Sequence, residues 1–376
     1  MLRKLENRGS GQGTSYQRFE KVTPGGMRMP RGRVGVTGGR EAGVIVLPGC
    51  LVVVSISVGL SAHGDRAPVR DSSALNLMSS VWKALNNWAD TVDGVVLVTG
   101  AAGQVGAALV RHLRSVGLDA AATDARPAPF ADAIQCDLSS AAVAAELFRN
   151  RSISAVVHLA AVLPTAFRAD PLRGAEVNLG CAVHLIRAAF AAGVRRFVFA
   201  SSASVYGGSS EAMYAETSAP SPEDPYGAAK LAVEKVLEYL AKVRVCETVS
   251  LRIARVLGPG ATETASPWRS QIFEPPAPGR NELAIPFDPE ARLTVVHIDD
   301  LVRVFRILLE TPKLARPVYN APAEPIVAGE IGRLAESKGW RVSMGMARGG
   351  PGIDGTRFTR DFGFATRPIR EHIGDC

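Results

Sequence analysis

The sequence contains few of the residues that build disulfide frameworks and metal sites. Its 376 residues include only five cysteines and six histidines. The cysteines are odd in number and scattered, and no two form a Cys-x-x-Cys pair, which argues against a disulfide framework and a zinc site. The histidines are not paired at ligand spacing, so His158 and His297 are expected to be structural or to lie beside a cofactor. We therefore predict no metal site.

Outside the N-terminal quarter, the chain has almost no net positive charge. Residues 1–90 contain twelve Lys and Arg against six Asp and Glu, so they carry +6 of the formal charge of +7 and leave +1 for the rest. A nearly neutral body offers no extended basic surface to a polyanion. The charge distribution therefore argues against nucleic acid as a partner.

Residues 1–77 lack the pattern of a folded domain. Residues 1–42 are rich in Gly and Arg without periodicity, and we expect them to be disordered. Gly43 to Ala62 is 20 residues without a charge, long enough for a membrane-spanning helix. It is interpreted as a membrane anchor, as a targeting leader, or as part of an extension upstream of a true start at Met78. We favour the last interpretation, and with it a cytoplasmic protein, because strand and helix patterns begin only after Met78; Ser79 to Asp90 predicts a short amphipathic helix.

The first such pattern is a strand followed by a glycine-rich turn and a helix. Val95 to Thr99 is a short β-branched run of the kind found in buried parallel strands. Helical character from Ala107 to Val116 follows the turn. This arrangement places a pyrophosphate on a helix N-terminus, and the glycines let backbone approach phosphate. The turn therefore predicts cofactor contacts at Gly100, Gly103, Gln104, Val105 and Gly106. A similar turn at residues 34–39 is not followed by an amphipathic helix, so we do not expect it to bind a nucleotide.

The next two predicted strands carry acidic residues at their ends. The strand from Leu118 to Thr123 leads into Asp124, where a carboxylate hydrogen-bonds ribose hydroxyls and repels a 2′-phosphate. This favours NAD over NADP, although Arg126 acts in the opposite direction. Asp137 and Leu138 follow the third strand, within reach of an adenine. We therefore predict NAD as the cofactor.

Tyr226 and Lys230 are spaced for catalysis on one helical face. Four residues apart, they lie one turn apart, and an ammonium beside a phenol favours the phenolate and lowers the phenol pKa from its usual value near ~10. The predicted strand from Arg195 to Ala200 delivers Ser202, whose hydroxyl can bind the reacting oxygen. Such a set moves a proton on a C–OH group while a cofactor takes the hydride. A Tyr-x-x-x-Lys pair alone is usually a solvated helix face, but here it follows the glycine turn and the Ser-rich strand end in order.

Strands and helices alternate from Val95 to about Cys246. This alternation predicts an α/β fold with a doubly wound parallel sheet, the Rossmann fold. We expect an NAD-binding domain over residues 78–260 and a small C-terminal substrate-binding lobe over 261–376, with residues 290–325 completing part of the sheet. A single helix is predicted over Pro171 to Ala192.

These motifs together resemble the extended short-chain dehydrogenase/reductases of the NAD-dependent epimerase/dehydratase family, over roughly Gly94 to Cys376. The resemblance implies that Ser202, immediately before Ala-x-Val-Tyr-Gly, is catalytic, and that Lys230 also holds the nicotinamide ribose. It further implies a homodimer formed through the helices that flank the sheet. The segments that carry it, besides the glycine turn and the Tyr226–Lys230 pair, include Val156-Val157-His158-Leu159-Ala160-Ala161, Asn178, Phe199 to Gly207, Gly258-Pro259 and His297-Ile298-Asp299-Asp300-Leu301. We add Leu159, Ala160, Ala161 and Asn178 to the predicted cofactor contacts, and expect Asp299 and Asp300 to be a helix N-cap.

The chain departs from the sugar-nucleotide epimerases at two positions. Arg255 stands where they carry an Asn, and Leu293 stands where they carry an Arg that grips a diphosphate; Arg292 is one position off. A guanidinium at 255 suits a carboxylate or phosphate, although a salt-bridged surface arginine is an equal alternative. We take Ser204, Arg255 and Arg292 as candidate substrate contacts.

The sequence thus predicts an NAD-dependent enzyme that acts on a sugar-type hydroxyl of a small-molecule carbohydrate. A carbohydrate or nucleotide-sugar epimerase or dehydrogenase is favoured. One alternative is a sugar-acid dehydrogenase, because the segment 266–276 resembles the corresponding segment of the branch that oxidises sugar acids. The other is a non-catalytic NAD-sensing protein of the same fold. Ala203 and Ser204 occupy the positions of the Asp-Glu pair that 4,6-dehydratases carry, which argues against that reaction.

Overall fold

A computed structural model describes residues 94–208, 213–243, 246–261 and 266–374, together with the backbone of five strands between residues 2 and 56. The chain divides into two compact units, Met1–Ser80 and Val81–Cys376, and each is described by itself. Met78 and the helix predicted from Ser79 to Asp90 lie outside the described residues.

The first unit contains an antiparallel sheet. Its five strands pair in chain order: β1 Leu2–Leu5, β2 Ser15–Lys21, β3 Arg33–Thr37, β4 Arg40–Leu47 and β5 Cys50–Ile56. This differs from the disorder expected for residues 1–42, because each strand here pairs with a sequence neighbour and needs no helical or long-range pattern. The uncharged stretch from residue 43 forms strands in β4 and β5, as its β-branched residues favour. Among the described residues, no helix is long and apolar enough to cross a bilayer.

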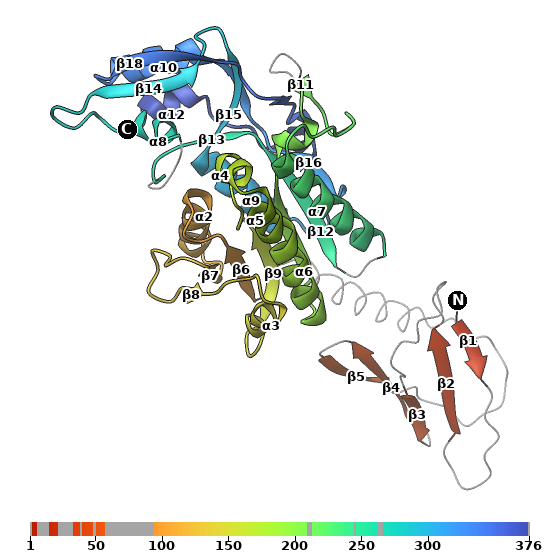
Figure 1. The fold of residues 1–376 in the computed structure, drawn as a ribbon. Coiled ribbons are helices and arrows are strands. Elements are labelled where there is room, and N and C mark those ends of the chain that lie inside the picture. Colours follow the sequence, from red (N-terminus) through yellow and green to blue (C-terminus); the bar gives the residue numbers. More distant parts are fainter. Residues whose placement is uncertain are drawn as a thin grey trace. The chain divides into compact units, whose positions relative to one another are not determined.

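The second unit is built on a seven-stranded parallel sheet (Figure 1). Its spatial order is β16-β12-β10-β9-β6-β7-β8, and every neighbouring pair is parallel. The order reverses between β6 and β9, and ligands of such sheets bind beyond the carboxyl ends of the strands at that point. The predicted doubly wound fold is therefore confirmed. The strands are β6 Val95–Thr99, β7 Ala120–Asp124, β8 Ile134–Gln135, β9 Ile153–His158, β10 Arg196–Ser202, β12 Glu247–Ile253 and β16 Val318–Asn320.

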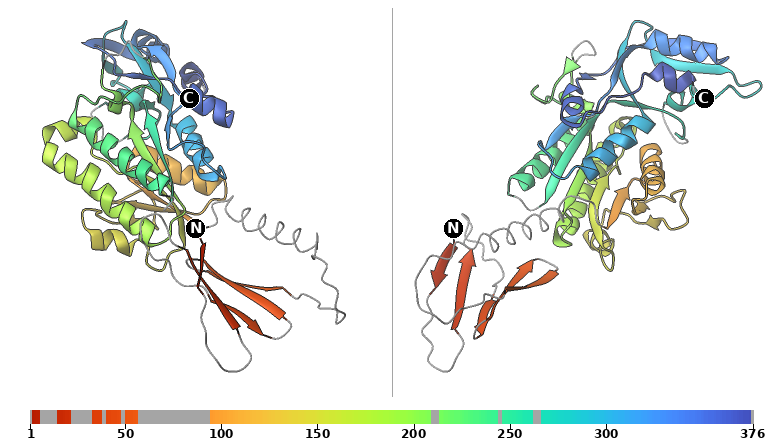
Figure 2. Two further views of the ribbon diagram at one scale, coloured as in Figure 1. Left: turned by 90° about the vertical axis from the view of Figure 1, so that its right-hand side faces the viewer. Right: turned by 180° about the vertical axis from the view of Figure 1, so that it is seen from behind.

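Helices cover both faces of the sheet, as the left view of Figure 2 shows. Val96 and Val98 pack into one apolar cluster and Leu97 into the other, because successive side chains of a strand point to opposite faces. The first cluster includes side chains from α2 Gln104–Ser115, α9 Ile298–Glu310 and α11 Thr356–Phe362. The second includes side chains from α3 Ala141–Glu146, α6 Ala182–Ala191 and α7 Pro225–Lys242. Both faces of the sheet are thus buried, as its nearly uninterrupted apolar strands require.

The C-terminal part adds a smaller lobe with its own apolar core, which includes Trp268, Leu293, Ile331 and Trp340. Figure 1 shows the lobe beyond the end of the sheet from which β12 leads into β13. The chain returns from the lobe to the sheet in β16, so residues 290–325 contribute to both parts, and the second unit is compact as a whole. The lobe contains β13 Arg255–Leu257, α8 Trp268–Gln271, β14 Glu282–Phe287, β15 Arg292–His297, β17 Glu324–Val327, α10 Ala328–Ser337, β18 Arg341–Ala347 and α12 Ile369–Gly374.

Candidate active site

The glycine turn between β6 and α2 is shaped to receive a phosphate. Gly100 has a φ of +75°, which favours glycine, and a β-carbon at Gly106 would lie 2.1 Å from the carbonyl oxygen of Gly100. α2 begins at Gln104, after Gly103, without a side-chain hydrogen bond to its first turn and without an acidic residue there. The backbone N–H groups of that turn therefore remain for an anionic ligand. These residues fit the pyrophosphate of a dinucleotide.

Asp124, at the end of β7, fixes the turn from the side. Its carboxylate accepts hydrogen bonds from the backbone N–H groups of Ala102 at 3.0 Å and Arg126 at 2.9 Å. The Arg126 side chain lies 3.9 Å from the same carboxylate. Asp124, which we predicted to bind the ribose, thus also stabilises the glycine turn.

The side chain of Gln104 is directed to the opposite side of the site. Its amide nitrogen donates to the carbonyl oxygens of Gly258 at 2.5 Å and Pro259 at 3.1 Å, and lies 3.3 Å from the hydroxyl of Ser270. The glycine turn is therefore linked to the loop that follows β13. The sequence predicted a cofactor contact at this residue and gave no sign of this link.

The loop after β9 is held by Asn178. The predicted helix over residues 171–192 is divided into α5 Pro171–Ala175, a π-helical segment at Glu176–Cys181, and α6. The π-helical segment carries Asn178, whose amide accepts from the Val162 N–H at 2.7 Å and donates to the Val162 carbonyl at 2.9 Å. Both polar atoms are thus bonded to the backbone beyond Leu159, Ala160 and Ala161. Asn178 orders the loop that we predicted to contact the cofactor.

Thr99 and His158 join the two strands at the switch point. The Thr99 hydroxyl accepts from the backbone N–H groups of Leu159 and Ala160, both at 3.2 Å, and lies 2.8 Å from Nδ1 of His158. Burial lowers the pKa of His158 to about 3, so the ring is neutral. His158 thus links β9 to β6 through Thr99, and a position beside the cofactor stays a prediction.

The residues after β8 differ in exposure. Asp137 is exposed, and its carboxylate accepts from the Ser139 N–H at 3.0 Å, which lowers the pKa of the carboxyl. Leu138 is buried in the sheet's second apolar cluster. The adenine contact therefore remains a prediction for Asp137 and for the backbone of Leu138.

Ser202, Tyr226 and Lys230 come together at the carboxyl end of β10. Ser202 is the last residue of that strand, and Tyr226 lies in the first turn of α7, where Pro225 opens the helix and Asp224 accepts from the Gly227 N–H at 2.7 Å. Lys230 donates to the Ala200 carbonyl at 2.8 Å, and its ammonium lies 5.7 Å from the centre of the Tyr226 ring. The structure thus brings the three predicted catalytic residues to one place.

Burial dominates the ionisation of this group. Burial raises the pKa of Tyr226 to about 12, and hydrogen bonding with Ser202 opposes the rise only in part. Burial also lowers the pKa of Lys230 to about 8, against the attraction of Glu234. The pKa of Tyr226 is thus raised and not lowered as expected, because removing the phenolate from water costs more than the hydrogen bond with Ser202 returns.

Ser204 stands beside Ser202 in the 3₁₀ turn Ala203–Tyr206. Its backbone N–H donates to the Ser202 oxygen at 3.1 Å, and the Ser202 hydroxyl donates to the Ser204 hydroxyl at 3.2 Å. The position of the Ser202 hydroxyl is therefore fixed by Ser204, the residue that we predicted to contact substrate.

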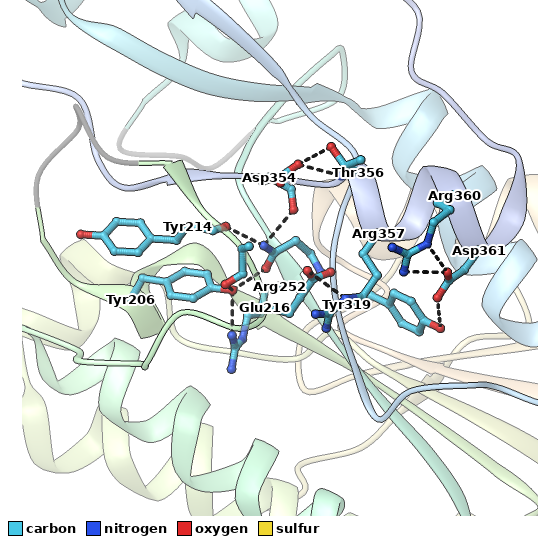
Figure 3. Close-up of polar contacts among 12 residues, drawn as sticks. Tyr206, Tyr214, Glu216, Arg252, Tyr319, Asp354, Thr356, Arg357, Arg360 and Asp361 are labelled. Atoms are coloured by element: carbon cyan, nitrogen blue, oxygen red, sulfur yellow. Dashed lines mark hydrogen bonds and ion pairs between the residues drawn. The ribbon is translucent and has the colours of Figure 1, made fainter.

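A buried polar network behind Ser202 was not predicted from the sequence. Arg252 and Glu234, 3% and 1% exposed, form an ion pair at 2.7 Å, and Glu234 also accepts from the Ser201 hydroxyl. Arg252 donates to the Tyr206 hydroxyl at 2.8 Å, and that hydroxyl donates to Asn320 at 2.8 Å. Figure 3 shows the part of the network around Tyr206 and Arg252. Only the structure pairs these residues, because they are 18 to 114 positions apart.

The two remaining substrate candidates lie on separate strands. Arg255 opens β13, which pairs with β15, and its guanidinium lies 4.6 Å from the centre of the Phe287 ring. Arg292, at the start of β15, is exposed, whereas Leu293 is 1% exposed in the core of the lobe. Neighbouring residues of a strand point to opposite faces, so Arg292 does not take the direction of Leu293.

The N-terminus of α9 differs from expectation. The N-cap is His297, whose Nδ1 accepts from the Asp299 N–H at 3.3 Å, while Asp299 and Asp300 occupy the first helical turn. The N-cap prediction for the two aspartates was therefore wrong by two positions, because an imidazole nitrogen replaced the expected carboxylate. His297 and His372 stack with centroids 3.7 Å apart and planes 17° apart. Together with Asp299 they form a group of three potential metal ligands within 4.8 Å. One nitrogen of each ring has a partner in the protein: Nδ1 of His297 accepts from the Asp299 N–H, and Nε2 of His372 lies 3.2 Å from the Asp300 carboxylate.

An open groove of about 860 Å³ lies between α2 and α9. Its lining includes Gly103 and Gln104 of the glycine turn, Arg111 further along α2, and Asp299 of α9. Ser202, Tyr226 and Lys230 are not among its lining residues, so the groove borders the glycine turn and not this group.

Comparison with known proteins agrees with this geometry. The model of the NAD dependent epimerase/dehydratase family matches residues 96–321, well over half of the chain. This chain belongs to that family. The predicted family, the enzyme class and the cofactor after which the family is named are thereby confirmed.

Several of the similar proteins are named as UDP-glucose 4-epimerases. UDP-glucose 4-epimerase from Azospirillum brasilense is 32% identical over 191 residues, 48% of this chain and 55% of the relative; the enzyme from Lacticaseibacillus casei is 31% identical over 172 residues, 43% and 52%. The chain thus spans about half the length of these curated relatives. MoeE5, solved with UDP-glucuronic acid and NAD, is 31% identical with a TM-score of 0.65, over 75% of this chain and 97% of that one. The UDP-glucose 4-epimerase of Thermus thermophilus, solved with NAD, is 25% identical with a TM-score of 0.65, over 74% and 96%.

Proposed function

We propose that this protein is an NAD-dependent epimerase or dehydrogenase that acts on a hydroxyl-bearing carbon of a sugar or nucleotide sugar. The observation that carries the proposal is the meeting of Ser202, Tyr226 and Lys230 at the end of β10, beside the switch point of the sheet. NAD, when bound at the glycine turn, supplies the acceptor for a hydride. The protein's own residues must then handle the proton of the hydroxyl.

In the proposed step, Tyr226 takes the hydroxyl proton, Ser202 orients the oxygen, and Lys230 stabilises the phenolate. Because the pKa of Tyr226 is about 12, the phenol carries its proton at neutral pH and is well suited to protonate an alkoxide when the hydride returns. The oxidation half-reaction needs the phenolate and is expected to accelerate as pH rises. An enzyme that keeps its keto intermediate and returns the hydride would be an epimerase, and one that releases it would be a dehydrogenase.

One observation favours a dehydrogenase for a sugar acid as a second candidate. Leu293 is buried at the position of the family's diphosphate-binding arginine, while Arg255 replaces an asparagine at the substrate side. These differences leave the cofactor residues unchanged and alter only the substrate side.

Absorbance at 340 nm separates these reactions. The full chain is mixed with NAD and a panel of uronic, aldonic and nucleotide sugars. Net NADH growth identifies a dehydrogenase, and interconversion of epimers without NADH identifies an epimerase. Tyr226→Phe should lower turnover by about 10²- to 10⁴-fold while NAD affinity remains near that of the unmodified protein. Equal turnover in this variant would remove Tyr226 from the mechanism.

A further inference from the structure

Two arginine side chains lie near each other on the substrate side of the sheet. Arg255 opens β13, and Arg269 lies in α8. Burial, and then the positive charge of Arg269, lower the pKa of Arg255 to about 10; burial also lowers the pKa of Arg269. The two like charges therefore act on each other in a partly buried region.

In the described part of the chain, the groups close to the two guanidiniums are aromatic rings and not carboxylates. In residues 94–208, 213–243, 246–261 and 266–374, no ion pair joins either one to a carboxylate, and the Nε atoms of both are buried without a hydrogen-bond partner. Aromatic rings lie close to them instead: Arg255 is 4.6 Å from the Phe287 centroid and Arg269 is 6.0 Å from that of Trp268. Partly buried guanidinium groups that have no carboxylate partner among the described residues are costly to keep charged, and an anionic ligand would offset that cost.

The place of the pair suits a substrate that reacts at Ser202. Ser202 stands opposite Ile253 in the register of β10 and β12, and Arg255 follows Ile253 by two residues. Two residues of chain and one strand spacing limit the distance between the α-carbons of Ser202 and Arg255 to about 12 Å. This is within the length of a small sugar derivative.

The helix that carries Arg269 is also bonded to the glycine turn. Ser270, the next residue, donates to the Gly258 carbonyl at 2.7 Å and lies 3.3 Å from the amide nitrogen of Gln104. The Gly258 N–H donates to the carbonyl of Arg269 at 3.0 Å. The arginine pair therefore has a defined position relative to both the glycine turn and the strand end.

We propose that Arg255 and Arg269 form an anion-binding subsite for a carboxylate or phosphate group of the substrate. The inference rests on the proposed function, because it names the substrate class of that same site. Paired guanidinium groups bind both kinds of anion through charge-assisted, bidentate hydrogen bonds. The substrate is thus a sugar acid or a phosphorylated sugar, and a neutral sugar leaves the pair unsatisfied.

Binding tests the subsite without depending on turnover. The full chain, saturated with NAD, is titrated by calorimetry with sodium glucuronate, inorganic phosphate, UDP-glucose and glucose. We expect glucuronate or one of the two phosphates to bind, and glucose not to bind. Arg255→Gln and Arg269→Gln should each weaken that binding about ten- to a hundredfold. Preference for glucuronate identifies a carboxylate as the source of the anion, and preference for phosphate or UDP-glucose identifies a phosphate.

Arg280→Gln is the matched control. Arg280 is exposed in the segment between α8 and β14, and its backbone N–H donates to the Ala277 carbonyl, a contact that the substitution leaves in place. The loss of its side chain should leave anion binding unchanged. Arg255→Lys keeps the charge and should bind with intermediate strength, which guards against a Gln variant that fails to fold; NAD binding reports folding in every variant.

The outcomes separate this inference from the proposed function. If the protein turns over a sugar and the arginine variants bind the anion as tightly as the unmodified protein, the subsite is overturned and the proposed function stands. Anion binding lost in the arginine variants, with no turnover of any sugar, would support the subsite and count against the proposed function. Equal binding of glucose and glucuronate would also overturn the subsite.

Discussion

Gly227, in the first turn of α7, packs directly on the backbone carbonyl of Ser204. A β-carbon at Gly227 would lie 2.4 Å from that oxygen, closer than real contacts allow. The absence of a side chain thus lets the helix that carries Tyr226 approach the turn that holds the Ser202 hydroxyl. The distance between the proposed base and the proposed hydrogen-bond donor depends on this contact.

Gly227→Ala is therefore expected to separate Tyr226 from Ser202. The added methyl group meets rigid backbone, so we expect a loss of stability of about 1–3 kcal/mol and a fall in kcat of about 10²-fold from misplacement of the reacting groups. Urea unfolding and steady-state kinetics measure the two effects. Gly180→Ala is the control: it is also helical, nothing lies within 4 Å of its β-carbon, and the change should stabilise by about 0.5–1 kcal/mol. Equal kinetics in both variants would contradict the role of the contact.

Lys230 makes a prediction about pH and stability. Its pKa is about 8 in the folded protein against 10.5 for an unperturbed lysine, so the folded state binds fewer protons between these values. The free energy of unfolding should rise with pH across this window, and the penalty of burying the ammonium is fully present below pH 8. That penalty corresponds to about 3 kcal/mol.

Lys230→Met removes the titrating group and keeps an apolar chain of similar length. Relative to the unmodified protein, the variant should gain stability most at pH 7, and the difference should shrink toward pH 10.5. Urea unfolding of both proteins at pH 7 and 9.5 measures it, and contributions of other groups, such as the Cys246 thiol, are common to both. A difference that does not change with pH would show that Lys230 does not titrate in this range.

The features that could be predicted from the sequence are those that depend on residues close together in the chain. The glycine turn, the Tyr226–Lys230 spacing and the alternation of strands and helices each lie within a few turns of chain, and all were found where expected. Patterns of this kind reflect hydrogen bonding between near neighbours, which residue type and spacing determine.

The contacts that were missed join distant segments. Nothing local indicates that Gln104 bonds to Ser270, or that Arg269 lies near Arg255, since the order of the strands decides both. The sign of the pKa change at Tyr226 was missed for a related reason: spacing places Lys230 beside the phenol but does not say how far both are removed from water.

Asp124 should control the choice between NAD and NADP. Asp124→Asn removes the charge that repels a 2′-phosphate and leaves Arg126 with one fewer negative neighbour. We expect the ratio of NAD to NADP affinity to fall by at least about tenfold. NAD itself should bind more weakly, because the amide keeps one acceptor oxygen where the carboxylate uses two, one for Ala102 of the glycine turn and one for Arg126. Titrations of both cofactors, followed by fluorescence, measure the ratio. The exposed Asp137→Asn is the comparison and should change both affinities alike; an unchanged ratio in Asp124→Asn would remove Asp124 from the ribose.

The buried pair of Glu234 and Arg252 should stabilise the strand end that presents Ser202. Glu234→Gln leaves Arg252 as an uncompensated charge that is 3% exposed, and it weakens the acceptor of the Ser201 hydroxyl. Breaking a pair of this kind costs about 3–5 kcal/mol. Arg252→Met should cost a similar amount, whereas the double variant Glu234→Gln with Arg252→Met removes both charges and should cost much less than the sum. Urea unfolding of the four proteins completes the cycle. Additive losses would mean that the two side chains act independently, despite the 2.7 Å between them.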